Sequence, residues 1–137
     1  MIAGLVVTFS TIGFGLRNPR YTALRLMLGE DGVLCHYLAQ LAGAKMGTVY
    51  QFYKQIKGRN ELEEHVRARL NEAGGSYRGQ ISFEAAHFLY ALCRLIRPRI
   101  VVETGVAAGV SSAFILKALN DNSYGILHSI DQLNYEE

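Results

Sequence analysis

An acid, two glycines and two serines follow an apolar run in the sequence IVVETGVAAGVSS, residues 100–112. Ile100, Val101 and Val102 predict a short strand of the kind that parallel sheets bury on both faces. A glycine-rich turn between such a strand and a helix can bind a ligand, because free backbone N–H groups and the positive end of the helix dipole point out of it. We expect the chemistry of this chain to lie in this turn.

A second acid stands at the end of the next predicted strand. Ile126 to Ile130 form this strand, and Asp131 follows it about twenty residues beyond Gly109, as in nucleotide-binding folds. A carboxylate in that place can accept hydrogen bonds from both hydroxyls of a ribose. The adenosine-binding prediction therefore depends on two features at a suitable separation.

The glycine spacing distinguishes two classes of cofactor. A dinucleotide loop has the pattern G-x-G-x-x-G, whose glycines would fall at Gly105, Ala107 and Val110. Only one of the three is met, and the Ala107 methyl would stand where pyrophosphate needs room. A dinucleotide or other nucleotide site remains an alternative, as does a turn whose glycines only serve the fold. Glu103 argues against the latter, because a carboxylate at the end of a buried strand needs a partner.

The pattern present is E-x-G-x-x-x-G-x-S, formed by Glu103, Gly105, Gly109 and Ser111. From about residue 82 to residue 131 the chain resembles the class I S-adenosylmethionine-dependent methyltransferases, in their small-molecule and sugar O-methyltransferase-like branch. The resemblance includes the preceding apolar helix and the segments RPRIVVETGVAAGVSS and GILHSID.

The resemblance implies an α/β, Rossmann-like methyltransferase fold that binds S-adenosyl-L-methionine. It implies that Glu103 orients the amino end of the cofactor, that Ser111 donates near its carboxylate and that Asp131 binds the ribose hydroxyls. The loop between them would supply close backbone approach. The residues that the resemblance assigns to the cofactor are Glu103, Gly105, Val106, Ala107, Gly109, Ser111 and Asp131.

The implied activity is methyl transfer to a hydroxyl of a small molecule or sugar. Such a transfer depends mainly on proximity and alignment, although oxygen acceptors usually also need a base or a metal. The sequence assigns no catalytic residue and no metal ligand. The family's sheet has seven strands, and residues 75–137 contain the first two. We therefore expect an incomplete fold, the front part of a longer protein, that is inactive alone.

Residues 1–74 lie outside the resemblance and predict a helical N-terminal region. The segment GGSYRGQ that follows is the clearest linker, so the domain boundary is placed after residue 74. The region could cover the sheet, form part of an acceptor pocket, mediate a homo-oligomer or touch a membrane, and the sequence leaves these open. Its predicted helices span residues 21–28, 33–41, 46–56 and 60–73. Residues 46–56 also suit a strand, and Asn60 is the expected N-cap of the last helix.

Residues 2–16 contain no charged side chain. As a helix this stretch would be about 22 Å long, which is short of the ~30 Å hydrocarbon core of a bilayer. We favour a buried or docking segment. A membrane-contacting segment, with Arg17 and Arg20 on the cytoplasmic side, stays open.

Ser82 predicts an N-cap for a largely buried helix over residues 83–97, which Pro98 ends. His87 on this helix is interpreted as a surface or packing histidine. Cys35 and Cys93 lie in apolar runs far apart, which indicates buried thiols of a reducing, cytoplasmic compartment.

The formal net charge of +2 is too balanced to indicate nucleic acid as a partner. A competing class of function is a non-enzymatic helical interaction or membrane-associated module with a vestigial nucleotide-binding fold.

Overall fold

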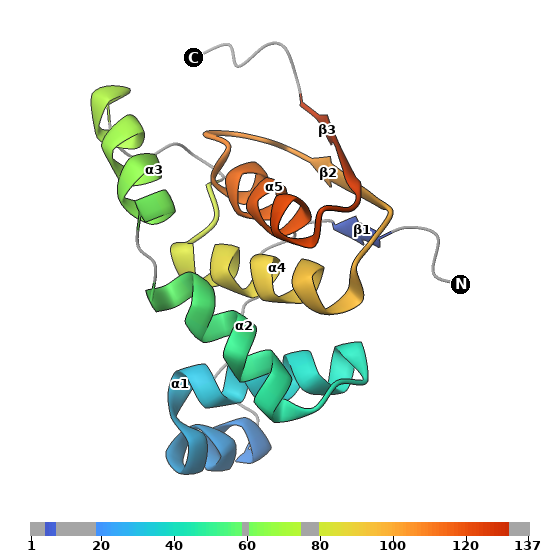
Figure 1. Ribbon diagram of the computed structural model, residues 1–137. Helices are drawn as coiled ribbons and strands as arrows, with labels where there is room; N and C mark the ends of the chain where they lie inside the picture. Colours follow the sequence, from blue (N-terminus) through green and yellow to red (C-terminus); the bar gives the residue numbers. More distant parts are fainter. Residues whose placement is uncertain (1–4, 8–18, 59–60, 75–79, 132–137) are drawn as a thin grey trace.

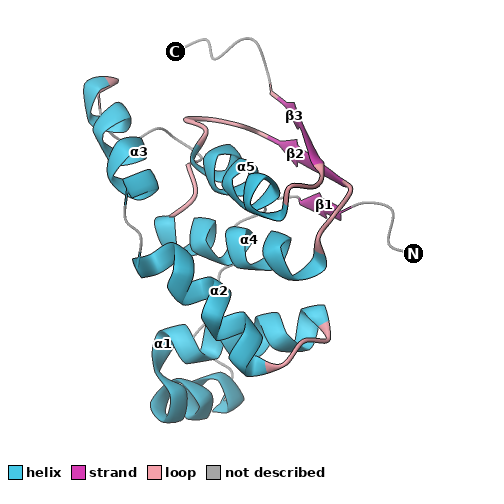
Figure 2. Ribbon diagram, in the orientation of Figure 1, coloured by secondary structure: helices cyan, strands magenta, loops and turns pink. Residues whose placement is uncertain are grey.

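The computed structural model describes residues 5–7, 19–58, 61–74 and 80–131 of the 137-residue chain (Figure 1). This part is an α/β structure, mostly helical with a small parallel sheet, which confirms the coarse fold class (Figure 2). Its elements are β1 (Leu5–Val7), α1 (Pro19–Ala42), α2 (Met46–Gly58), α3 (Glu61–Glu72), α4 (Phe83–Ile96), β2 (Ile100–Thr104), α5 (Val110–Asn122) and β3 (Ile126–Ile130).

The sheet has three parallel strands in the order β1-β2-β3. In its register Val101 stands opposite Leu127, and Glu103 stands opposite Ser129. Because side chains alternate along a strand, these four point to the same face. Helices α4 and α5 cover that face (Figure 1), and Val101 and Leu127 pack into the core beside them. Strands β2 and β3 with α5 form the β-α-β unit that the sequence predicts.

The core has two parts that meet at α4. One part joins α4 to β2, α5 and α3 through residues such as Tyr90 and Phe114. The other joins α4 to α1 and α2 through residues such as Leu38 and Val49. Helix α4 is therefore buried on most of its circumference, as expected, and the N-terminal helices stack on the side of α4 away from the sheet (Figure 1).

The ends of α4 follow the local signals in the sequence. Ser82 accepts a hydrogen bond from the backbone N–H of Ala85 at 3.3 Å, as an N-cap should. At the other end Arg97 adopts a left-handed conformation and donates its N–H to the carbonyl of Cys93. The helix ends at Ile96, ahead of Pro98, as predicted.

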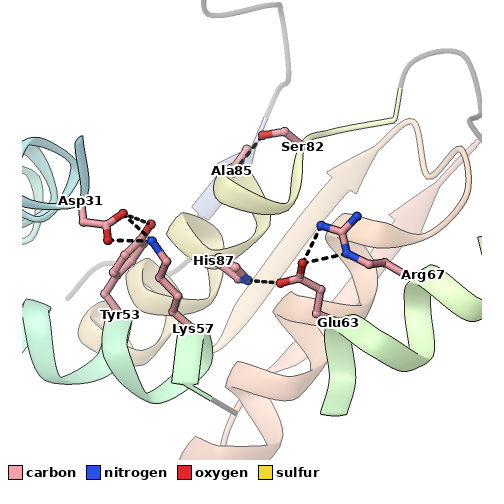
Figure 3. A network of polar contacts seen from close by, with 8 residues as sticks. All are labelled: Asp31, Tyr53, Lys57, Glu63, Arg67, Ser82, Ala85 and His87. Carbon is pink, nitrogen blue, oxygen red and sulfur yellow. Dashed lines mark hydrogen bonds and ion pairs between the residues drawn. The ribbon is translucent and has the colours of Figure 1, made fainter. Parts of the chain in front are cut away.

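Polar pairs attach α1 and α3 to their neighbours (Figure 3). Glu63 accepts from Arg67, as the i,i+4 spacing predicts, and its other oxygen lies 2.9 Å from Nε2 of His87. His87 is 6% exposed, so its role is packing and pairing rather than surface exposure. Asp31 accepts from the hydroxyl of Tyr53 and from Lys57, and burial together with Asp31 raises the pKa of that hydroxyl.

The sequence analysis, which predicts a helical region over residues 1–74 and favours a buried or docking segment over 2–16, did not predict the strand β1. This strand lies within the uncharged stretch 2–16 and pairs in parallel with β2. Its sequence LVV suits a strand, and the edge of β2 supplies the hydrogen-bonding partner. The rest of that stretch lies outside the described residues, as do Asn60 and most of the predicted linker. None of the described helices is long and apolar enough to span a membrane.

The interruption between the predicted helices 21–28 and 33–41 is confirmed within α1. Gly29 has φ of 71° and ψ of 175°, so two helical segments meet there at a kink.

We predict that Gly125→Ala destabilises the protein by about 3 kcal/mol. Gly125 has φ of +103°, and a Cβ there would lie 2.4 Å from the carbonyl oxygen of Pro98. Gly43→Ala is the control: φ is +60° and nothing lies within 4 Å of its Cβ position, so about 1 kcal/mol is expected. Urea unfolding followed by circular dichroism compares them. Equal losses of unfolding free energy in the two variants would contradict the steric clash with Pro98 as the cause.

A second prediction concerns the Tyr90–Asp121 pair, which joins α4 to α5. Burial, then the hydrogen bond to Asp121 at 2.7 Å, raises the pKa of Tyr90 to about 12. Burial alone would raise the pKa of Asp121, but Lys117, Tyr90 and Arg94 outweigh it and lower that pKa. A lowered folded-state pKa stabilises the protein above the unfolded value of about 4, and this stabilisation is lost as pH falls.

Asp121→Asn should therefore reduce the free energy of unfolding at pH 7 by about 1–2 kcal/mol, because it removes hydrogen bonds to a charged group. At pH 3 the two proteins should differ less. Denaturant titrations at both pH values check this, and a difference that grows on acidification would refute it.

Candidate functional site

The loop between β2 and α5 has an unusual backbone. Gly105 and Gly109 both have φ of +78°, and Ala107 between them has φ of +46°. Left-handed angles therefore occur at every second residue. The turn is closed by a bond from the Gly109 N–H to the carbonyl of Val106 at 2.8 Å. Left-handed non-glycine residues such as Ala107 are strained and are frequent at functional sites.

The two loop glycines leave open space beside them. A Cβ at Gly105 or Gly109 would meet nothing within 4 Å, in contrast to Gly125. Packing inside the protein therefore does not require these glycines. The left-handed angles favour glycine, and the missing side chains leave the backbone accessible to a ligand.

Helix α5 begins directly after the loop without a side-chain cap. Gly109 is its N-cap residue and provides no side-chain cap hydrogen bond. The N–H groups at the start of a helix have no partner within the helix, and they attract anions. The first turn of α5 could therefore receive a carboxylate or a phosphate.

Glu103 is a fully buried acid, 0% exposed, near the end of β2. Its Oε2 accepts from the hydroxyl of Ser112 at 2.6 Å and from that of Ser129 at 2.8 Å. Its Oε1 is buried and has no hydrogen-bond partner. An unmet buried acceptor costs about 1–3 kcal/mol, and such groups are rare enough to need an explanation. One oxygen of this carboxylate is therefore buried without a donor in the structure.

Asp131 is brought against the loop. Its Oδ2 accepts from the backbone N–H of Val106 at 3.2 Å, and the Gly105 N–H bonds to the carbonyl of Ile130 at 2.9 Å. The side chain of Asp131 is exposed at the carboxyl end of β3. The loop thus has a buried carboxylate on one side and an exposed carboxylate on the other.

Most of the site residues predicted from sequence are gathered here. Ser111 is buried in the first turn of α5, and its expected contact with a cofactor carboxylate stays a prediction. Sequence reasoning missed Ser112 and Ser129. Ser129 could have been found by aligning the two predicted parallel strands, because it is the residue of β3 opposite Glu103.

Other groups with chemical potential lie away from this loop. The described residues contain no cluster of His, Cys, Asp and Glu that could hold a metal ion. Cys35 and Cys93 are buried and free, as predicted, and burial raises the pKa of Cys93 to about 12. An open hollow at the other end of α5 and β3 contains none of the predicted site residues. It is lined by Leu116, Leu119, Asn120, Ser123, Tyr124, Gly125, Ile126 and Leu127.

Comparison with known proteins gives no match. No family model matches the chain, and neither a curated protein nor a solved structure shows significant similarity to it.

We predict that Asp131→Ala changes the free energy of unfolding by about 1 kcal/mol or less, because Asp131 is exposed and water can replace the hydrogen bonds of an exposed side chain. Urea unfolding measures this. A loss above about 2 kcal/mol would show that Asp131 is needed for folding, and would contradict its assignment as a ligand-facing group.

Proposed function

We propose that this chain binds S-adenosyl-L-methionine through Glu103, the loop 105–109 and Asp131. It would form the cofactor-binding part of a Rossmann-like O-methyltransferase that acts on a hydroxyl of a small molecule or sugar. The observation that carries the proposal is the buried, unpartnered Oε1 of Glu103 beside the uncapped start of α5.

The three polar features match the two ends of one kind of ligand. An ammonium group would satisfy Oε1 of Glu103 with a charge-assisted hydrogen bond. A carboxylate beside that ammonium would lie at the first turn of α5, where the helix dipole favours negative charge. Asp131 could accept from a ribose diol. A nucleoside joined to an α-amino acid has all three groups, and S-adenosylmethionine and S-adenosylhomocysteine are such molecules.

The loop must shift for this ligand to bind. Oε1 of Glu103 is enclosed, so a donor reaches it only when neighbouring atoms move. The loop is suited to such a shift, because glycine adopts left-handed and right-handed backbone angles with similar ease. Asp131, which accepts from Val106, would exchange that bond for the ribose hydroxyls or share its oxygens between them.

The chain's own residues would bind and orient the cofactor. When bound, the cofactor supplies a methyl group that is already activated for transfer. Glu103 and the start of α5 would fix its amino-acid end, and Asp131 would fix its sugar, so that the methyl group points in one direction. Alignment of this kind can make a large contribution to the rate of a displacement reaction.

A second candidate function is a non-enzymatic interaction module with a vestigial nucleotide-binding fold. It is favoured by the exposed side chains of Ile126 and Ile130, which are 58% and 61% exposed on β3. An apolar strand at a sheet edge can pair with another protein. This candidate makes no use of the unpartnered oxygen of Glu103.

The test is a titration of the ¹⁵N-labelled 137-residue chain with S-adenosylhomocysteine, followed by NMR. We predict shifts localised to Glu103, residues 105–112 and Asp131, and at least a tenfold loss of affinity in Asp131→Ala and in Gly109→Val. The valine would place a side chain in the open space beside the loop. A tenfold loss corresponds to about 1.4 kcal/mol, less than one good charged hydrogen bond.

Matched controls separate binding from folding. Gly43→Val also places a side chain at a left-handed glycine with open surroundings, but far from the loop in the turn after α1. Glu72→Ala removes an exposed acid from α3. Both should bind like the unaltered chain. Unchanged affinity in Asp131→Ala and Gly109→Val would refute the site, and tighter binding of NAD would favour a dinucleotide site.

A further inference from the structure

We infer that Ser112 and Ser129 are positioning residues that reserve one oxygen of Glu103 for the ligand's amino group. They would thereby make the site select nucleosides with an amino-acid end over nucleosides without one. The inference rests on the proposed cofactor site and adds the determinant of its selectivity.

Both serine hydroxyls bind the same carboxylate oxygen. The distances to Oε2 of Glu103 are 2.6 Å from Ser112 and 2.8 Å from Ser129. A carboxylate has about four lone-pair positions, so two donors fill those of Oε2 and leave those of Oε1. The terminal torsion of a glutamate is broad and close to two-fold, and it would not hold this orientation without such donors.

The two donors come from different elements. Ser112 lies in the first turn of α5, and Ser129 lies on β3 opposite Glu103. The orientation of the carboxylate is therefore set by the β-α-β unit and not by one flexible segment. Ser112 also places Glu103 beside the helix start, where the ligand's carboxylate is expected, so the two charges of an amino-acid end would each meet their complement.

This arrangement differs from one that only makes the buried acid tolerable. Donors to both carboxylate oxygens would offset the free-energy cost of burial more fully. The buried amide of Asn122, by comparison, donates to the carbonyl of Cys93 at 2.9 Å. Gln80 and Arg94 also have an unpaired atom, but these residues are partly exposed. Glu103 is the fully buried acid with an unused acceptor in the part that the structure describes.

The experiment compares two ligands that share an adenosine and a thioether sulfur. S-adenosylhomocysteine has the amino-acid end, and 5′-methylthioadenosine lacks it. Affinities for both are measured by NMR titration on the full chain and on the variants Ser112→Ala, Ser129→Ala and the double variant. We expect the double variant to lose about tenfold in affinity for S-adenosylhomocysteine and to keep its affinity for methylthioadenosine within about twofold.

Two controls accompany these variants. Ser112→Thr and Ser129→Thr keep the hydroxyl and should keep the preference for S-adenosylhomocysteine. Ser82→Ala removes a serine hydrogen bond of similar kind at the start of α4, and it should leave both affinities unchanged. Thermal unfolding of each variant confirms that it is folded at the temperature of the titration.

The other outcomes refute either this inference or the proposed function. Equal losses for the two ligands would show that the serines only support the fold of the loop, and no loss would show that they do not position Glu103. Either result refutes the inference while the proposed cofactor site stands. An unaltered chain that binds neither ligand refutes the proposed function, and the inference falls with it.

Discussion

A buried carboxylate can be tolerated only where fixed donors meet it, and Glu103 imposes this condition on its surroundings. Its Oε2 needs Ser129, so β3 must lie parallel to β2 in the observed register. It needs Ser112 as well, so α5 must begin directly above the end of β2. The sharp turn at Gly125 then returns the chain to the start of β3. Loss of β3 or α5 would remove one of the two donors to this buried acid.

The remaining helices hold this unit in place. Helix α4 supplies one large apolar surface to the sheet and α5, and another to α1 and α2. Helix α3 is joined to it by the pair of Glu63 and His87 (Figure 3). The candidate site therefore combines a loop of adaptable backbone with rigid elements beneath it, which is the usual division between a binding loop and its scaffold.

Local signals explain what could be predicted from the sequence. Three features can each be predicted from a few neighbouring residues, and the structure shows all of them. They are the valine-rich run of β2, the glycine pair after it and the N-cap at Ser82. The acids Glu103 and Asp131 could be placed at one edge because parallel strands end together. The association of loop and acids with methyl transfer stays a proposal, because geometry shows which groups a ligand meets but not which reaction follows.

Long-range pairing explains what could not be predicted. Strand β1 has only three residues, and its partner β2 lies far along the chain, so the short apolar run LVV does not by itself predict the pairing. Ser112 and Ser129 belong to a common residue type, and only the folded register brings both to one oxygen. The sequence favoured Ser111 at this site, whereas its neighbour Ser112 makes the contact with Glu103. A one-residue difference on a helix moves a side chain by about 100°, which composition and spacing do not resolve.

The central claim is that Oε1 of Glu103 is kept for the ammonium of an adenosyl amino acid. A crystal structure of the chain with S-adenosylhomocysteine tests it most directly. We predict the ligand's amino nitrogen within about 2.7–3.2 Å of Oε1, both serine bonds to Oε2 retained and the ribose hydroxyls at Asp131. A ligand bound with its amino end elsewhere, or a water molecule on Oε1 in the complex, would contradict the claim.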